Sequence, residues 1–267
     1  MKKTLSIIIF LLSFFRAFSQ DATEIIAQTE SAYSKLTNYV DSGSVIMALP
    51  GSVGNVIQHY TIAMDREGNI SHTIVNAEPS FHTDYAYFTA KGDDSGVFIR
   101  STGTTDTSRY TPDIAGARLT AAGGGILFFY QQLLPTPSSK PDLVQTSPLN
   151  VYDKAMRLMD TVLNGQTCYV VQTTRSILIT QERIDQSNKS LDSMYLAEQG
   201  TTRPENLDQT KPGLKTFTHT YFIRKTDFMI LSWSQEHQND HGSSSKRIVV
   251  AHPRYNVPDF EKYLARQ

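Results

Sequence analysis

The spacing of apolar residues changes along this chain from a helical period to an alternating one. Near the start, apolar side chains recur every three or four positions from Ile25 to Tyr39 or Val40, with polar residues between them. This spacing predicts one long amphipathic helix. Asp21, with a glutamate three positions later, fits the N-cap of a capping box. The turn-forming run Asp41-Ser42-Gly43 is expected to end the helix.

Beyond residue 44 apolar and polar residues alternate, which predicts strands. Short turn sequences separate most of these runs, as in consecutive antiparallel hairpins. Asn164-Gly165 is the strongest of the hairpin signals, because both residues tolerate the positive φ angles of a type I′ turn. Ten strands are predicted, over residues 45–49, 56–64, 70–77, 85–89, 97–99, 155–163, 167–173, 217–224, 228–237 and 248–251.

Three segments depart from the strand pattern. Residues 126–134 are almost wholly apolar and stop at Pro135, so they predict a short helix. Residues 181–215 are polar, charged and interrupted by prolines, which is typical of an insertion or a lid. A last helical turn is expected over residues 259–264. The sum predicts the α+β class, with a strongly curved, mostly antiparallel sheet of about ten strands closed by helices, in one domain spanning residues 20–267.

The first 19 residues have the three parts of a secretory signal peptide. Lys2 and Lys3 give a positive end, residues 5–15 are almost wholly apolar, and small residues precede the expected cleavage site before Gln20. The apolar run is too short to span a bilayer. No cysteine stands near the cleavage site, so a lipid cannot be attached there. We therefore expect a periplasmic or secreted protein that does not span the membrane.

Composition and charge narrow the range of partners. The chain has 25 Lys and Arg against 26 Asp and Glu, and the first 19 residues hold three of the basic ones, which leaves a mature formal charge of −4. That net charge attracts neither nucleic acid nor an anionic membrane surface. The one cysteine, Cys168, excludes an internal disulfide. Its strand-like surroundings favour a small buried hydrophobe over a nucleophile.

The sequence offers no catalytic or metal-binding pattern. Of seven histidines, only His237 and His241 have the i, i+4 spacing of helical ligands, and they stand at a strand end and turn, where that spacing does not put them on one face. No Gly-x-Ser-x-Gly elbow marks a nucleophile. The three glycines at 123–125 lack the lysine of a phosphate loop, which favours a hinge over an anion site. We predict no enzyme activity, no metal and no cofactor.

The predicted strands and the short helix carry a surplus of aromatic and large apolar side chains. Met229, Leu231 and Trp233, for example, share one predicted strand face. Two interpretations need the same residues, and the pattern does not separate them: a packed core, or a cavity that takes an acyl chain or other apolar ligand and is gated by the helix. The candidate cavity residues are Tyr60, Ile62, Met64, Tyr85, Tyr87, Phe128, Phe129, Tyr130, Met229, Leu231 and Trp233.

Four segments resemble the LolA/LolB-like superfamily, the outer-membrane lipoprotein carriers and their exported relatives. Residues 26–45 are similar to the family's first helix and strand. Residues 163–171 resemble its hairpin in which a glycine is followed by a Cys/Asp-Tyr-x-Val strand, and residues 221–230 resemble its hairpin ending in Ile-Asp-Lys-x-Thr. Residues 255–260 are similar to its closing Tyr-x-x-Asn-x-Pro segment. The order of these segments matches the family from residue 21 to 264.

The resemblance implies an incomplete, strongly curved antiparallel β-barrel closed by helices, whose hollow accepts acyl chains in the true carriers. Related domains instead sense envelope lipids or lipoproteins and bind regulators. The end of the signal, Phe18-Ser19-Gln20, resembles exported proteins of Bacteroidetes-type bacteria, which implies a periplasm.

Three hypotheses follow. The first is a periplasmic binding protein for a lipid, an acyl chain or a lipoprotein, with a role in outer-membrane lipoprotein sorting. The second is an envelope sensor or interaction module with a self-filled core and an envelope protein as its partner. The third, least favoured, is an exported hydrolase.

Overall fold

The computed structural model describes residues 20–48, 55–77, 84–89, 96–101, 105–110, 126–134, 149, 151–186, 188–189, 192, 211–239 and 244–264. The predicted signal peptide, the three glycines at 123–125 and most of the predicted insertion at 181–215 lie outside these residues. The helices are α2 (Ala22–Ser34), α4 (Ile126–Leu133) and α7 (Glu261–Leu264).

The strands form a single sheet that is antiparallel at every described pairing. They are β1 (Asn38–Ala48), β2 (Asn55–Asp65), β3 (Ile70–Asn76), β4 (Asp84–Thr89), β5 (Gly96–Ser101), β6 (Thr105–Tyr110), β7 (Lys154–Arg157), β8 (Thr161–Leu163), β9 (Gln166–Ile179), β10 (Gly213–Arg224), β11 (Ile230–Asn239), β12 (Ser244–Val250) and β13 (Arg254–Tyr255).

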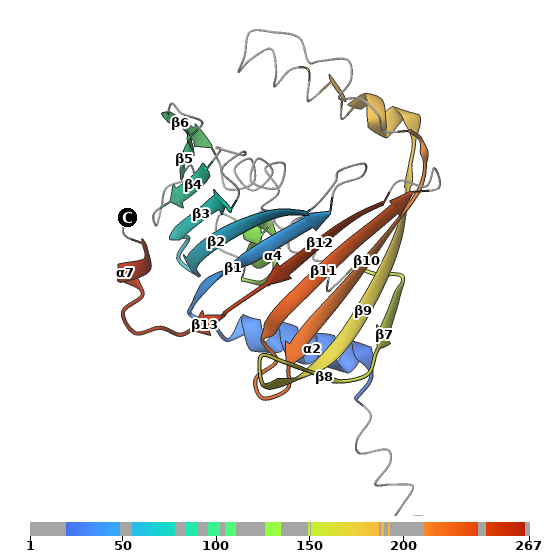
Figure 1. Cartoon of the computed structure of the whole chain (residues 1–267), viewed down its shortest axis with the longest axis horizontal. Helices are drawn as coiled ribbons and strands as arrows, with labels where there is room; N and C mark the ends of the chain where they lie inside the picture. Colours follow the sequence, from blue (N-terminus) through green and yellow to red (C-terminus); the bar gives the residue numbers. More distant parts are fainter. Residues whose placement is uncertain are drawn as a thin grey trace, which may run out of the picture.

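The strand order makes a curved, open sheet. It runs β6-β5-β4-β3-β2-β1-β12-β11-β10-β9-β7, with β13 pairing with β1 and β8 pairing with β9. In the described part the two ends of this order, β6 and β7, do not pair, so the barrel stays incomplete (Figure 1). The predicted α+β class and curved antiparallel sheet are confirmed. The sheet has 13 strands rather than ten, because β6 and β13 were not predicted and residues 155–163 form two short strands.

The first helix begins as predicted but ends earlier. Asp21 caps α2, since its Oδ1 accepts a hydrogen bond of 2.7 Å from the Glu24 amide. The predicted continuation to Tyr39 or Val40 is wrong, because α2 stops at Ser34 and both residues belong to β1. They lie on opposite faces of that strand, and both are buried, Tyr39 in the main core and Val40 in a second cluster. A helix stripe would have buried only one of them.

Helices cover both faces of the sheet. On the concave face, α2 and α4 contact each other, and both contribute side chains to the main hydrophobic core. On the outer face, α7 packs against β2 and β3 (Figure 1), where Val40, Ala63 and Phe260 form the second, smaller cluster. The concave face is therefore the place to look for an interior site.

Two further predictions, a hairpin turn and the end of the insertion, can be compared with the structure. Asn164 and Gly165 both have positive φ angles, 49° and 76°, which confirms the predicted hairpin between β8 and β9. The predicted insertion reaches too far at its end, since residues 213–215 pair with residues 177–179 of β9. The two ends of the insertion therefore meet on neighbouring strands.

Candidate ligand-binding site

One continuous row of apolar side chains crosses the concave face. Its members are paired directly from strand to strand across β1, β12, β11, β10 and β9. Each is at most 3% exposed and belongs to the main core. We call these residues the aromatic row: Val45, Val249, Trp233, Tyr221 and Val171.

Helix α4 fills the space above the aromatic row with its own side chains. The Phe129 ring stacks on Trp233, with centroids 4.7 Å apart, and lies 6.3 Å from the Tyr221 ring. Tyr130 packs against Tyr39 at 4.6 Å. Because these rings are almost completely buried, α4 acts in this structure as a plug in the concave face.

A buried carboxyl group ties this plug to the sheet. Asp41 Oδ2 accepts hydrogen bonds from the hydroxyls of Tyr60, Tyr130 and Tyr39 at 2.7, 3.0 and 3.2 Å. Its Oδ1 accepts one from the backbone amide of His252 at 2.6 Å. Burial raises the pKa of the Asp41 carboxyl, although these four donors act to lower it. Burial also raises the pKa of Tyr60 and of Tyr130, so both remain hydroxyl donors at neutral pH.

Sequence analysis predicts a different role for Asp41, as part of the turn that ends the first helix. The structure corrects this, because Asp41 lies inside β1 with its side chain 1% exposed. Gly43, two residues on, leaves room for the cluster. A Cβ there would lie 1.9 Å from the Val250 carbonyl oxygen and 2.8 Å from the Tyr60 hydroxyl.

Most of the predicted cavity residues do come together in the main core. Those with buried side chains in that cluster are Tyr60, Ile62, Met64, Tyr87, Phe129, Tyr130, Met229 and Trp233. Tyr85 is partly buried and packs against the cluster. Phe128 belongs to α4, but its side chain lies outside the described part of the structure.

Leu231 is the exception. It is buried but lies outside the main core cluster, and Ile230 takes that place instead. The pairing of β10 with β11 shifts register between Phe222 and Ile223, so the alternation of faces breaks beside Leu231. The predicted shared face of Met229, Leu231 and Trp233 is therefore wrong for its middle member.

A second row lies two residues along each strand from the aromatic row. Its residues are paired directly: Thr173 with His219, His219 with Gln235, and Gln235 with Arg247. Side chains two positions apart in a strand point to the same face, so this row also faces the interior. We call these four residues, Thr173, His219, Gln235 and Arg247, the polar row. Sequence reasoning missed it, because membership depends on the register of four strands.

Burial changes the acid–base behaviour of the polar row. It lowers the pKa of His219 to about 4, so this imidazole is neutral at physiological pH. The ring stacks on Tyr221 of the aromatic row at 6.1 Å. Burial also lowers the pKa of the Arg247 guanidinium, whose Nε is buried and has no hydrogen-bond partner among the described residues.

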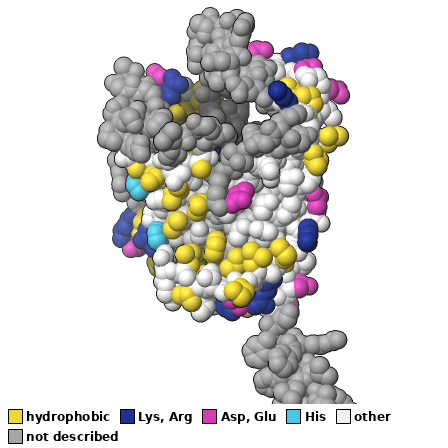
Figure 2. All heavy atoms as spheres, turned by 45° about the vertical axis from the view of Figure 1, so that its right-hand side comes forward, with side chains coloured by type: hydrophobic (Ala, Val, Ile, Leu, Met, Phe, Trp, Pro, Cys, Tyr) yellow, Lys and Arg dark blue, Asp and Glu magenta, His cyan; other side chains and the backbone are white. Residues whose placement is uncertain are grey.

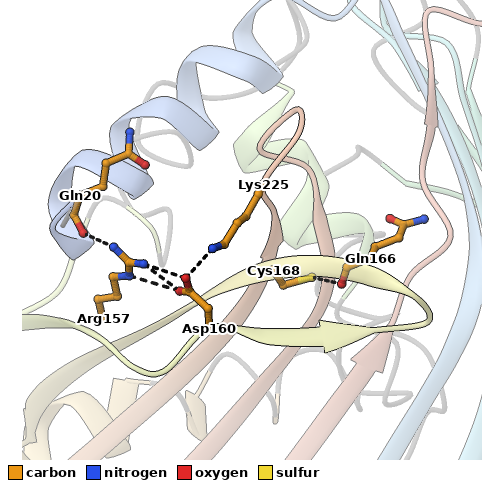
Figure 3. Close-up of polar contacts among 6 residues, drawn as sticks. All are labelled: Gln20, Arg157, Asp160, Gln166, Cys168 and Lys225. Atoms are coloured by element: carbon orange, nitrogen blue, oxygen red, sulfur yellow. Dashed lines mark hydrogen bonds and ion pairs between the residues drawn. The ribbon is translucent and has the colours of Figure 1, made fainter. Parts of the chain in front are cut away.

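Cys168 lies away from both rows and fits its predicted role as a small buried residue. Its thiol is fully buried, burial raises its pKa, and its Sγ lies 3.5 Å from the Gln166 carbonyl oxygen (Figure 3). Beside it, Asp160 bonds both Arg157 and Lys225, and Arg157 donates to the Gln20 carbonyl at 2.9 Å. These bonds tie the start of α2 to β7, and burial keeps the Cys168 thiol in its less reactive, protonated form.

A pocket of about 270 Å³, lined by both polar and apolar residues, opens on the outer face, beside α7. Its lining includes Ser42, Thr61, Thr73, Arg254 and Tyr263. The Thr61 and Thr73 hydroxyls bond each other at 2.6 Å, and Arg254 donates to the Tyr263 hydroxyl at 3.1 Å. Four of these five polar side chains are therefore already paired with one another, so this pocket is a weaker candidate than the concave face.

Within the described ranges, no three histidine, cysteine or acidic side chains come close enough together to hold a metal ion. None of the helices in those ranges combines the length and the apolar character needed to cross a membrane.

Comparison with known proteins adds a likeness in fold. No protein-family model and no curated protein matches the chain. Among solved structures, LprF from Mycobacterium bovis is similar at 11% identity and a TM-score of 0.44, over 89% of this chain and 93% of that one. The lipoprotein LppX from Mycobacterium tuberculosis is similar at 10% identity and a TM-score of 0.43, over 89% and 96%.

A LolA superfamily protein from Nitrosomonas europaea is similar at 8% identity and a TM-score of 0.32, over 93% of this chain and 99% of that one. Likenesses this distant say nothing of the ligand, which has to be inferred from the residues of this chain.

Proposed function

We propose that this chain is an exported binding protein for a hydrophobic ligand: a lipid, an acyl chain or the acyl groups of a lipoprotein. The observation that supports this most is the aromatic row beneath α4. A curved sheet with large apolar side chains on its concave face gives an acyl chain the surroundings it needs. The predicted signal peptide would deliver the protein to the periplasm, where a carrier of acyl chains serves lipoprotein sorting.

Binding requires α4 to move away from the sheet, and the contacts of this helix keep the free-energy cost of that movement small. The helix has only eight residues, and the described contacts of its aromatic side chains with the sheet are few. Phe129 stacks on Trp233 and Tyr221, and Tyr130 packs against Tyr39 and bonds Asp41. An acyl chain that replaces Phe129 would bury similar apolar area, so the exchange would cost little hydrophobic free energy. We propose that α4 is the gate and that the chain catalyses no reaction.

Fluorescence of Trp233 tests this proposal, because it is the only tryptophan of the chain. Adding a fluorescent fatty acid should quench or shift its emission with a saturable dependence on concentration. Phe129→Ala, which removes the ring stacked on Trp233, should tighten binding. Phe88→Ala is the matched control, since Phe88 lines the pocket on the outer face. An unchanged Trp233 signal, together with no lipid in native mass spectrometry of protein purified from envelope extract, would contradict the proposal.

A second candidate function is an envelope interaction module, and one observation favours it. Large apolar side chains are exposed near β7 and β8: Met156 at 41%, Met159 at 90% and Val162 at 63%. Figure 2 shows hydrophobic side chains gathered on the lower half of the molecule. Exposed apolar groups of this kind suit a protein partner. Native mass spectrometry separates the two candidates, since the module should purify empty and bind a specific envelope protein.

A further inference from the structure

Positive charge gathers on the concave face near the polar row. Arg175 in β9 and Lys215 in β10 have the same strand parity as Thr173 and His219, so they belong to the same face. With Arg247, the four neighbouring strands β9–β12 bring three cations to this face. The one acidic residue in these strands, Glu236, has the opposite parity.

This local charge contrasts with the charge of the whole chain. The mature chain carries a formal charge of −4, whereas the described strands β9–β12 bring cations and no carboxylate to this part of the concave face. Burial and, after it, the charge of Lys215 lower the pKa of His237, which lies on the same face. The same positive potential that disfavours a charged His237 would stabilise a negatively charged group at this place.

Arg247 is the cation next to the aromatic row. Its guanidinium has five N–H donors and no acceptor, and its buried Nε has no partner within the described ranges. Trp233 Nε1, in the neighbouring row, is also buried there without a partner. Buried donors without acceptors cost free energy that packing does not return. Both donors lie where the apolar and polar rows meet.

We propose that the polar row binds the head group of an acidic amphiphile, a carboxylate or a phosphate, while the acyl chain lies on the aromatic row. This inference rests on the proposed function and names its ligand class. Arg247 donates to the oxyanion, and the neutral His219 and Gln235 can each donate a further hydrogen bond. Arg175 and Lys215 add attraction at longer range. The Trp233 indole N–H donates to the head group or to the first polar atoms of the chain.

Three ligands of equal chain length test the proposal: palmitate, palmitoyl lysophosphatidic acid and hexadecanol. The wild-type protein should bind at least one of the two anions at least tenfold more tightly than the neutral alcohol, as a charged hydrogen bond allows. The anion that binds more tightly identifies a carboxylate or a phosphate source. Arg247→Gln should remove most of the preference and leave hexadecanol binding unchanged.

Two further variants keep the test sharp. Arg254→Gln makes the same charge change on the outer face, beside Tyr263, and should leave the preference intact. Arg247→Lys keeps a cation in place and should retain part of the preference, which provides a readout if Arg247→Gln unfolds. Equal binding of all three ligands to the wild-type protein would overturn the head-group proposal and leave the proposed function standing. Binding of none of them would overturn both.

Discussion

The aromatic row and the polar row lie side by side on one face of one sheet, yet they have opposite effects on the stability of the fold. Every side chain of the aromatic row is buried against others, and Phe129 of α4 completes the packing. The polar row contains a guanidinium whose Nε is buried without a described partner. The apolar packing of the first row stabilises the fold, although Trp233 Nε1 is also buried without a described partner, whereas the buried guanidinium of the second row costs stability. A costly arrangement next to a well-packed one points to a use other than folding.

The largest loss of stability is expected from a substitution in the aromatic row. Trp233→Ala should reduce the free energy of unfolding by about 3–5 kcal/mol, because a fully packed aromatic ring is replaced by a cavity. Trp233 is 3% exposed and stacks on Phe129 at 4.7 Å. Urea denaturation followed by circular dichroism measures the change. A loss below about 1 kcal/mol would mean that the space above the row is open and wet.

Two histidines with the same lowered pKa sharpen the comparison. His72 is fully buried in β3, and burial lowers its pKa to about 4. The unfolded chain binds more protons between pH 6.5 and 4, so stability falls as the pH falls through this window. The expected loss from His72 alone is about 3 kcal/mol. Thermal unfolding against pH should show it, and His72→Gln should flatten the profile.

His219 is the matched comparison for His72. It has the same lowered pKa but belongs to the polar row and is only partly buried. His219→Gln should flatten the stability profile about as much as His72→Gln does, because the two pKa shifts are the same. Only His219→Gln should weaken binding of an acidic amphiphile, and equal weakening by both variants would remove the functional role of the polar row.

Weakening the hydrogen bonds that hold α4 to the sheet should lower the free energy of unfolding by less than Trp233→Ala or the protonation of His72 does. Asp41→Asn keeps the shape but leaves one acceptor oxygen where two receive four hydrogen bonds. We expect a loss of about 1–3 kcal/mol, as for an imperfectly satisfied buried polar group. Hydrogen exchange should show faster opening of the α4 amides than of the β10 amides. Equal protection of both would show that Asp41 does not hold the helix.

The smallest effect is expected from the insertion. Deleting residues 186–212 should leave unfolding cooperative, because Ile179 and Gly213 pair directly and a short turn can join the strands. Shortening a loop changes the free energy of loop closure by only about 1 kcal/mol. Ile184, which is buried, stays in place. Loss of the folded protein would mean that the segment packs as core.

The regular parts of the fold could be predicted from the sequence because their signals are local. Alternating apolar residues and the Asn164-Gly165 turn determine the hairpin that joins β8 to β9. Strand β6 was missed because its residues, Thr-Asp-Thr-Ser-Arg-Tyr, carry no apolar alternation. The end of α2 was misplaced because Tyr39 continues the helical spacing, although its burial comes from a strand.

The site was only half predictable for a different reason. Large apolar residues indicate a buried position whatever their place in the sequence, so most of the candidate cavity residues could be predicted. The three hydroxyl partners of Asp41 come from β1, β2 and α4, and Tyr130 is 89 residues away in the chain. Arg247 meets Gln235 only through the register of β11 with β12. No residue spacing within a single segment predicts the contacts of Asp41 or the pairing of Arg247 with Gln235.

Asp41 also bears on how fast a ligand can exchange. Lifting α4 removes the Tyr130 hydroxyl from a carboxyl group that stays enclosed by the sheet. The path to an open state therefore passes through an arrangement with one acceptor less satisfied, which adds to the activation barrier. We expect release of a bound acyl chain to be limited by the lifting of α4 rather than by diffusion. Such a protein would hold its ligand long enough to travel with it between two membranes.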